Sequence, residues 1–255
     1  MRARHDQHFL IDPHAVERIA NLAEVKGKRV LEIGPGNGAL TLALLNHDAI
    51  VGAVELDSSL CEELKALFSD EIVRGQLTVQ QGDATRCELP RFDIVVSNLP
   101  YSVSSKITFR LLDIGFEEAV LMYQSEFAER MVAPAGTKNC GRLSIMVQTF
   151  ATVQVCFNLP PHCFSPQPKV HSTVVKIFPR EQPIFPINNP HLYADVVRAL
   201  FSHRRKTVRN CLKGSGGMLD YEWVKRVITT LPEEILKIRP EELYLEDFAT
   251  IANMA

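Results

Sequence analysis

The chain has 255 residues, of which 46% are hydrophobic and 23% charged, so it can bury a full core without disulfides or metal ions. Its six cysteines include no C-x-x-C pair, which argues against a zinc site or a disulfide framework and favours a reduced, cytoplasmic protein. We expect no signal peptide and no membrane span, and the net charge of -2 decides nothing about nucleic acid.

Short apolar runs alternate with helical patterns over the first half of the chain. Asp12 and Pro13 predict the start of a helix, as its N-cap and its first residue. The apolar runs lie at residues 29–33, 50–54, 77–79, 94–96 and 120–122. Buried strands that alternate with helices predict an α/β fold, with a parallel sheet covered on both faces.

The pattern changes after the fifth run. Residues 152–157 and 172–178 predict an antiparallel hairpin at the edge of the sheet, since only a Pro-rich loop joins them. Residues 179–190 contain four prolines and no helical period, so we divide the chain into domains 1–180 and 181–255. The second domain is expected to be small and all-helical, with helices near 191–201, 204–213, 221–229 and 246–253.

A glycine-rich loop with the pattern G-x-G-x-G follows the first predicted strand. Gly34 and Gly36 let the backbone approach a ligand closely, and the next helix offers free N–H groups, so we expect a nucleotide-like ligand. Glu55 ends the second strand and is placed to accept hydrogen bonds from ribose hydroxyls. These two features leave NAD and S-adenosylmethionine as equal alternatives.

Three details favour S-adenosylmethionine. Glu32 precedes the glycines and suits a cationic amino-acid group, and the glycine spacing differs from the G-x-G-x-x-G of dinucleotide folds. Asp83 and Ala84 follow the third strand, where an Asp can accept a hydrogen bond from the exocyclic amine of adenine. The alternative that Asp83 merely caps the next turn stays open.

The most specific motif is N-x-P-Y, formed by Asn98, Leu99, Pro100 and Tyr101 after the fourth strand. It is a form of the motif of enzymes that methylate planar amino nitrogens. The lone pair of adenine N6 is delocalised, so the amine needs acceptors, here the Asn98 side-chain oxygen and the Leu99 carbonyl. Pro100 fixes φ and Tyr101 can stack on the base, whereas an ordinary proline turn is the alternative. Catalysis would then rest on orientation and electrostatics, without a strong general base.

Taken together, these motifs resemble the ribosomal RNA small-subunit adenine N6,N6-dimethyltransferase family (KsgA/RsmA type). The resemblance covers nearly the whole chain and rests on seven stretches, at residues 7–10, 32–36, 54–57, 82–84, 98–101, 164–172 and 201–210. It implies a Rossmann-like class I methyltransferase sheet with helices on both faces and a helical C-terminal domain that seats the RNA.

The resemblance also implies roles for single residues. His8, Leu10, Gly34, Glu55, Asp83 and Asn98 would contact S-adenosylmethionine, and Phe164 would stack on the flipped adenine opposite Tyr101. Asp6 departs from the family's usual Gly, and His8 stands where many members have Asn, so a structural role for His8 remains an alternative. Phe164 lies in a segment that is too Pro-rich to predict a strand, where an aromatic residue can also be a core plug.

Positive charge is concentrated in the basic segment, residues 198–213, which holds six Arg or Lys and no acid. Such a run is usually a solvated face. Next to an adenine-methylating site, we interpret Arg204, Arg205, Lys206 and Arg209 as phosphate contacts that give affinity without reading sequence. The target adenine must leave its stack, which favours hairpin loops over duplex RNA.

The predicted function is therefore dimethylation of two adjacent adenosines in a hairpin near the 3′ end of small-subunit (16S) rRNA. We expect S-adenosylmethionine as cofactor, no metal, the immature small ribosomal subunit as partner and a monomeric protein. The alternatives are methylation of large-subunit rRNA and a non-catalytic role in ribosome assembly or transcription. Labelled S-adenosylmethionine with unmethylated small subunits would distinguish them.

Overall fold

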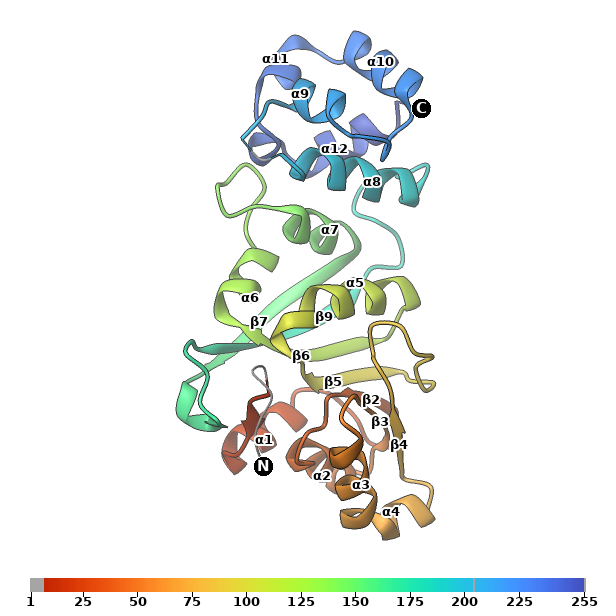
Figure 1. The fold of residues 1–255 in the computed structure, drawn as a ribbon, viewed down its shortest axis with the longest axis vertical. Helices are drawn as coiled ribbons and strands as arrows, with labels where there is room; N and C mark the ends of the chain where they lie inside the picture. Colours follow the sequence, from red (N-terminus) through yellow and green to blue (C-terminus); the bar gives the residue numbers. More distant parts are fainter. Residues whose placement is uncertain (1–6, 204, 255) are drawn as a thin grey trace. The chain divides into compact units, whose positions relative to one another are not determined.

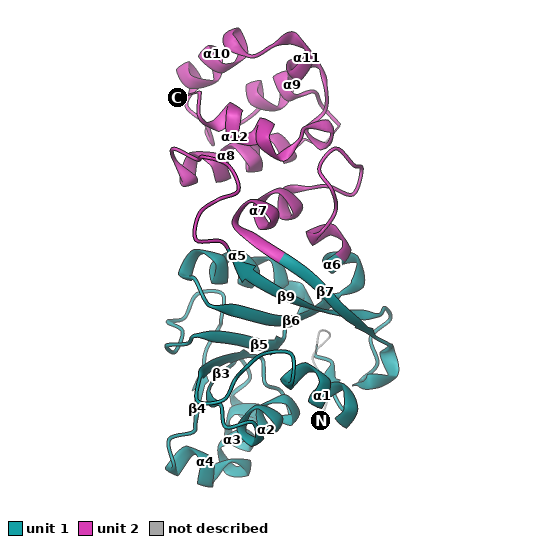
Figure 2. Cartoon of the chain, turned by 180° about the vertical axis from the view of Figure 1, so that it is seen from behind, with its two compact units in different colours: residues 1–128, 153–179 teal, residues 129–152, 180–255 magenta. Residues whose placement is uncertain are grey.

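The chain forms two compact units in a computed structural model, which describes residues 7–203 and 205–254. The first unit holds residues 1–128 and 153–179, and the second holds 129–152 and 180–255 (Figure 2). The compact units thus differ from the expected division at residue 180 by the segment 129–152, which belongs to the second unit. The functions assigned to the two domains stay predictions.

A seven-stranded sheet with the order β4-β3-β2-β5-β6-β9-β7 forms the framework of the described part of the first unit (Figure 1). The strands are β2 (Arg29–Ile33), β3 (Ile50–Glu55), β4 (Leu77–Gln81), β5 (Ile94–Asn98), β6 (Glu118–Gln124), β7 (Ala151–Leu159) and β9 (Ser172–Pro179). β2 to β6 pair in parallel, and β9 pairs antiparallel with β6. The expected α/β fold is confirmed, and the two late strands are neighbours at the sheet edge as expected.

The strand order reverses at β2, and this reversal positions the site. From β2 the chain continues to β3 and β4 on one side, whereas β5 and β6 lie on the other. Ile33 at the end of β2 is paired with Val54 of β3. In such sheets the crevice outside the carboxyl ends of the strands at the switch point takes the ligand. Each segment that the motifs single out between residues 32 and 101 follows one of these strand ends.

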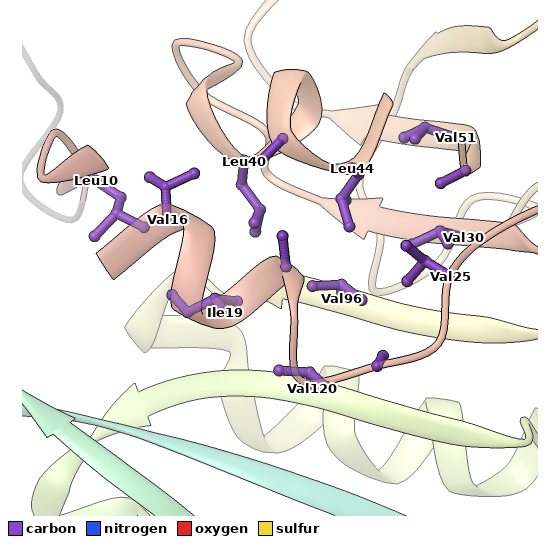
Figure 3. Close-up of a cluster of buried hydrophobic side chains, with 14 of the residues drawn as sticks. Leu10, Val16, Ile19, Val25, Val30, Leu40, Leu44, Val51, Val96 and Val120 are labelled. Atoms are coloured by element: carbon purple, nitrogen blue, oxygen red, sulfur yellow. The ribbon is translucent and has the colours of Figure 1, made fainter. Parts of the chain in front are cut away.

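Helices cover both faces of the sheet. Those of the first unit are α1 (Pro13–Ala20), α2 (Ala39–Asn46), α3 (Ser58–Leu67), α4 (Ser69–Val73) and α5 (Ser104–Ile114), and α6 (Ser125–Met131) leads into the second unit. Ile19 of α1 and Leu44 of α2 belong to one buried cluster with Val30 and Val96 of the sheet (Figure 3). On the opposite face, Thr108 of α5 is hydrogen-bonded to the buried Tyr123 hydroxyl of β6, 2.8 Å away.

Asp12 caps α1 as predicted. Its carboxylate accepts hydrogen bonds from the backbone N–H groups of His14 (2.9 Å) and Ala15 (3.3 Å). Pro13 occupies the first turn, where its missing N–H costs nothing. Buried residues at Val16, Ile19 and Ala20 then follow the helical period.

The second unit is helical and has its own hydrophobic cluster, which includes Tyr193 and Phe248. Its helices are α7 (Arg142–Phe150), α8 (Pro190–Phe201), α9 (Val208–Lys213), α10 (Tyr221–Thr230), α11 (Glu233–Lys237) and α12 (Leu245–Ala252). The helix expected over 204–213 begins only at Val208, after its N-cap residue Thr207. α7 and α11 were not predicted. Over the described residues, no helix has the length and apolarity to cross a membrane.

Candidate active site at the carboxyl edge of the sheet

Two adjoining hollows form a cleft at the carboxyl ends of β2, β3 and β5. The hollows share four lining residues, Gln7, Gly34, Glu55 and Pro100. The first is lined further by residues of the N-terminal segment, the glycine loop and the N-x-P-Y loop, including His8, Leu10, Glu32, Gly36, Asn98, Leu99 and Tyr101. The second, of about 270 Å³, is lined by Asp83, Ala84, Ile107 and their neighbours. The structure therefore brings together nearly all of the site residues expected in the first domain.

Gly36 requires its glycine for both conformation and space. Its φ is 58°, and a Cβ atom there would lie 2.6 Å from the ring of Phe9. Phe9 comes from β1 (Phe9–Leu10), a short strand that the sequence does not signal. The aromatic ring thus packs directly on the glycine loop, which holds the loop backbone at the edge of the cleft.

Glu55 is only 5% exposed, and its carboxylate accepts hydrogen bonds from two backbone N–H groups. One carboxylate oxygen accepts from the Asp57 N–H at 3.0 Å and the other from the Gly36 N–H at 3.3 Å. A carboxylate has about four acceptor positions, so two remain for a ligand. This position at the end of β3 suits acceptance from ribose hydroxyls, which stays a prediction.

Glu32 is a buried acid without a cationic partner among the described residues. It is 1% exposed, lines the cleft and accepts a hydrogen bond from the Thr41 hydroxyl at 2.6 Å. Burial raises the pKa of Glu32 to about 8, which the Thr41 hydrogen bond opposes and the Glu55 charge reinforces. A cation entering the cleft would favour the ionised form, so the site is suited to a positively charged ligand.

Asp83 makes the turn contacts that the alternative interpretation describes. Its carboxylate accepts from the Thr85 N–H at 2.9 Å, the Thr85 hydroxyl at 2.7 Å and Arg86 Nε at 2.7 Å. The Thr85 hydroxyl, followed by the Thr85 N–H and Arg86, lowers the pKa of Asp83 to about 2. A fourth acceptor position is left for an adenine amine, so the cap and the predicted ligand contact are compatible.

The N-x-P-Y loop begins at the last residue of β5. The Asn98 side chain donates from Nδ2 to the His8 carbonyl at 3.0 Å, which leaves Oδ1 as its acceptor atom. Leu99 buries its side chain, and within the described part of the chain its carbonyl accepts no hydrogen bond. Pro100 packs near Gly34, where an added Cβ would lie 3.4 Å from the proline ring. Both predicted acceptors are therefore present at one point of the cleft.

Tyr101 and His8 are neighbours in the cleft, and each is held by a hydrogen bond to another residue. The Tyr101 hydroxyl is 2.7 Å from the Ser172 hydroxyl at the start of β9, and the Tyr101 and His8 rings lie 5.5 Å apart. His8 donates from Nδ1 to the Pro166 carbonyl at 2.7 Å, because a carbonyl can only accept. Ser172 was missed as a site residue, although it ends one of the motif stretches.

Phe164 corrects an expectation. The segment is not a loop at this point, because Phe164–Ser165 form β8, which pairs antiparallel with β1 and aligns Leu10 with Phe164. Phe164 is 1% exposed and belongs to the main buried cluster, as does Leu10. The ring is a core residue in this conformation, as the alternative interpretation states, and its stacking on the flipped adenine stays a prediction.

The basic segment lies in the second unit. Arg205 and Lys206 are exposed and form no ion pair with the described residues. Arg209 is instead paired with Glu233, and this contact lowers the pKa of Glu233. Arg204 lies outside the described residues. Among the described residues, no group of His, Cys, Asp or Glu could hold a metal ion.

Comparison with known proteins identifies the family of the chain. The family described as ribosomal RNA adenine dimethylase matches residues 1–252. The protein called probable ribosomal RNA small subunit methyltransferase A of Methanospirillum hungatei is 58% identical over 99% of this chain and 98% of its own. Its counterpart in Methanococcoides burtonii is 44% identical over 98% of this chain and 91% of its own.

Two solved structures share the fold. A dimethyladenosine transferase from Plasmodium falciparum superposes with a TM-score of 0.78 and 32% identity, over 96% of both chains. The 23S rRNA methyltransferase ErmE has a TM-score of 0.67 and 24% identity, over 96% of this chain and 99% of its own, and at that identity it supports the fold alone. From the match over nearly its whole length, we conclude that the chain belongs to the ribosomal RNA adenine dimethylase family.

Proposed function

We propose that this protein transfers methyl groups from S-adenosylmethionine to the N6 amine of two adjacent adenosines in small-subunit rRNA. The observation that carries the proposal is the Asn98 side chain, which is fixed by its Nδ2 bond to the His8 carbonyl and so keeps Oδ1 as an acceptor. The Leu99 carbonyl supplies a second acceptor at the same loop. Two acceptors match the two N–H groups of an unmethylated adenine amine.

The chain's own residues account for catalysis through orientation. The cofactor supplies an electrophilic methyl group on a positively charged sulfur. Asn98 and Leu99 hold the N–H groups so that the N6 lone pair turns out of the ring plane, and Tyr101 offers a stacking surface. The methylated nitrogen is strongly acidic and loses its proton without a dedicated base, so preorganised polar contacts carry most of the effect.

The cleft residues fit S-adenosylmethionine by charge and by hydrogen bonding. Glu32 offers a buried carboxylate to the cationic portion, and Glu55 offers acceptors to the ribose. Asp83 and Ala84 line the second hollow and suit the adenine ring, while His8, Leu10, Gly34 and Gly36 enclose the first.

The small-subunit substrate is supported by the names of the relatives, since the proteins that are 58% and 44% identical to this chain are called small subunit methyltransferases. We place the two adenosines in a hairpin near the 3′ end of 16S rRNA and the action on an immature subunit, by a cytoplasmic monomer. Arg205 and Lys206 would contact phosphates. Arg204 would do the same, and Arg209 would have to leave Glu233 to do so.

Incorporation of label tests substrate choice. The purified protein is incubated with S-adenosylmethionine labelled in its methyl group and with unmethylated small subunits, large subunits or neither. We expect label in small-subunit rRNA alone. Label in large-subunit rRNA would favour a large-subunit rRNA methyltransferase, the activity that the name of ErmE states. No transfer to either subunit would favour a non-catalytic assembly factor.

A further inference from the structure

Arg110 has no role in the catalytic scheme above, yet it contacts the loop that carries Asp83. It lies on α5, the helix that follows the N-x-P-Y loop, and the segment that joins β4 to β5 passes beside this helix (Figure 1). Val103 and Ile107, which line the second hollow, lie about two turns and one turn before Arg110. Ile107 and Arg110 are three residues apart and so lie on the same side of α5, and Val103 is the residue just before the helix.

The guanidinium of Arg110 bonds both ends of the loop. Nη1 donates to the Ala84 carbonyl at 2.6 Å, and Nη2 donates to the Cys87 carbonyl at 2.5 Å. The Asp83 carbonyl at the start of the turn accepts from the N–H groups of Arg86 and Cys87. Arg110 thus supplies donors for the Ala84 and Cys87 carbonyls, which the N–H groups of the turn do not satisfy. A planar fork with two parallel donors fixes direction as well as distance.

We propose that Arg110 is a positioning residue for adenine recognition, because it holds the Asp83–Cys87 loop so that the Asp83 carboxylate faces the adenine amine of the cofactor. The inference rests on the proposed function, in which S-adenosylmethionine occupies this cleft. In this proposal Arg110 supports the cofactor site from behind the loop and touches neither the cofactor nor the RNA. Because α5 also continues the N-x-P-Y loop, one helix supports both the cofactor loop and the substrate loop.

Arg86 is the contrasting arginine of the same loop. It pairs with the Asp83 carboxylate itself, its side chain is 81% exposed, and it bonds no backbone carbonyl of the described loop residues. An exposed ion pair of this kind contributes little. Arg110 is half-buried and acts on the backbone, so we expect the loop conformation to depend on Arg110.

The test measures base discrimination by calorimetric titration. The probes are S-adenosylhomocysteine and its inosine counterpart, in which a 6-oxo group replaces the adenine amine. The variants are Arg110→Gln, Arg110→Lys and, as a matched control, Arg29→Gln. Arg29 also uses two guanidinium nitrogens, which bond the Asp93 carboxylate. Arg29 is the first residue of β2 and so lies at the edge of the sheet opposite the cleft.

We expect the wild type and Arg29→Gln to prefer the adenine ligand by at least about tenfold, since a site built for a donor rejects a ligand without one. Arg110→Gln should weaken S-adenosylhomocysteine binding by about tenfold and leave the inosine ligand nearly unchanged, so the preference disappears. Arg110→Lys, which retains one charged donor, should show an intermediate preference.

An Arg110→Gln variant with the wild-type preference would overturn the inference while the proposed function stands. If Arg110→Gln does not fold, Arg110→Lys decides: an unchanged preference in the folded protein contradicts the inference and a reduced one supports it. A wild type that binds neither ligand would overturn the proposed function together with the inference, so the two failures are distinguishable.

Discussion

The cleft of the first unit and the basic segment of the second unit hold their polar groups in opposite ways. In the cleft, Glu32 and Glu55 are buried, and each is fixed by hydrogen bonds to neighbouring loops or helices. In the basic segment, Arg205 and Lys206 are exposed to solvent. Chemistry on a single amine needs orientation, which burial provides, whereas attraction of phosphates needs only charge in water. Changes in the cleft should therefore affect catalysis or cofactor binding, and changes in the basic segment should affect RNA affinity.

The largest effect is expected for Asn98→Ala. Loss of one oriented acceptor should slow methyl transfer by about 100-fold or more, by analogy with the loss of one preorganised donor from an oxyanion hole. RNA affinity should stay unchanged, because Asn98 is not part of the basic segment. Single-turnover kinetics at saturating cofactor separates the chemical step from binding. A near wild-type rate would mean that the N-x-P-Y stretch is only a proline turn.

Glu55→Ala should weaken S-adenosylmethionine binding by about 1.5 to 3 kcal/mol for each charge-assisted hydrogen bond that it removes. Calorimetric titration of the wild type and the variant measures this change. Glu55 also accepts from the Gly36 and Asp57 N–H groups, so Glu55→Gln, which keeps the shape of the side chain and one of these two acceptors, is the milder comparison variant. An unchanged dissociation constant in Glu55→Ala would remove the ribose assignment.

Glu32 should make the stability of the cofactor-free protein depend on pH. Its pKa is raised from 4.5 to about 8 by burial, so between these values the folded protein keeps a proton that the unfolded chain has released. The free energy of unfolding should then fall as pH rises from about 5 to about 8, by at most about 1.4 kcal/mol per pH unit. Denaturant titrations at several pH values should show a smaller slope for Glu32→Gln. Equal slopes would contradict the assignment.

The smallest effects belong to the basic segment. Neutralising Arg204, Arg205 and Lys206 together should weaken RNA binding and reduce the salt dependence of log K by about 0.7 to 0.9 for each phosphate that the variant no longer neutralises. Arg209→Gln should change the salt dependence less, because Arg209 is paired with Glu233. Cofactor affinity should be the same in all these variants. Salt slopes equal to the parent's in the triple variant would show that the segment is only a solvated face.

The sequence predicted the cleft because parallel strands bring their carboxyl ends to one edge of the sheet. The five apolar runs lie within β2 to β6, so the motifs that follow the first four runs fall at that edge. The predicted family is confirmed by the match over residues 1–252, and the predicted fold class by the sheet itself and by its likeness to a solved dimethyladenosine transferase. Local signals were sufficient here since each strand and its loop are contiguous in the chain.

Contacts between distant segments were not predicted. The pairing of β1 with β8 joins residues more than 150 positions apart. Each of these strands has only two residues, which is too short to show the alternating pattern of a strand. The same pairing accounts for the buried position of Phe164, and the Arg110 contacts with the loop after β4 also lack a local pattern. Helix α11 has five residues, too few to show an amphipathic repeat.

The most direct test of the central claim is the identity of the methylated nucleoside. Unmethylated small subunits are incubated with the wild type or Asn98→Ala, and their rRNA is digested and analysed by mass spectrometry. We expect N6,N6-dimethyladenosine at two adjacent positions for the wild type and little of it for Asn98→Ala. Methylation of a ribose, of another base or of another atom of adenine would contradict the account of the cleft as a site for the adenine amine.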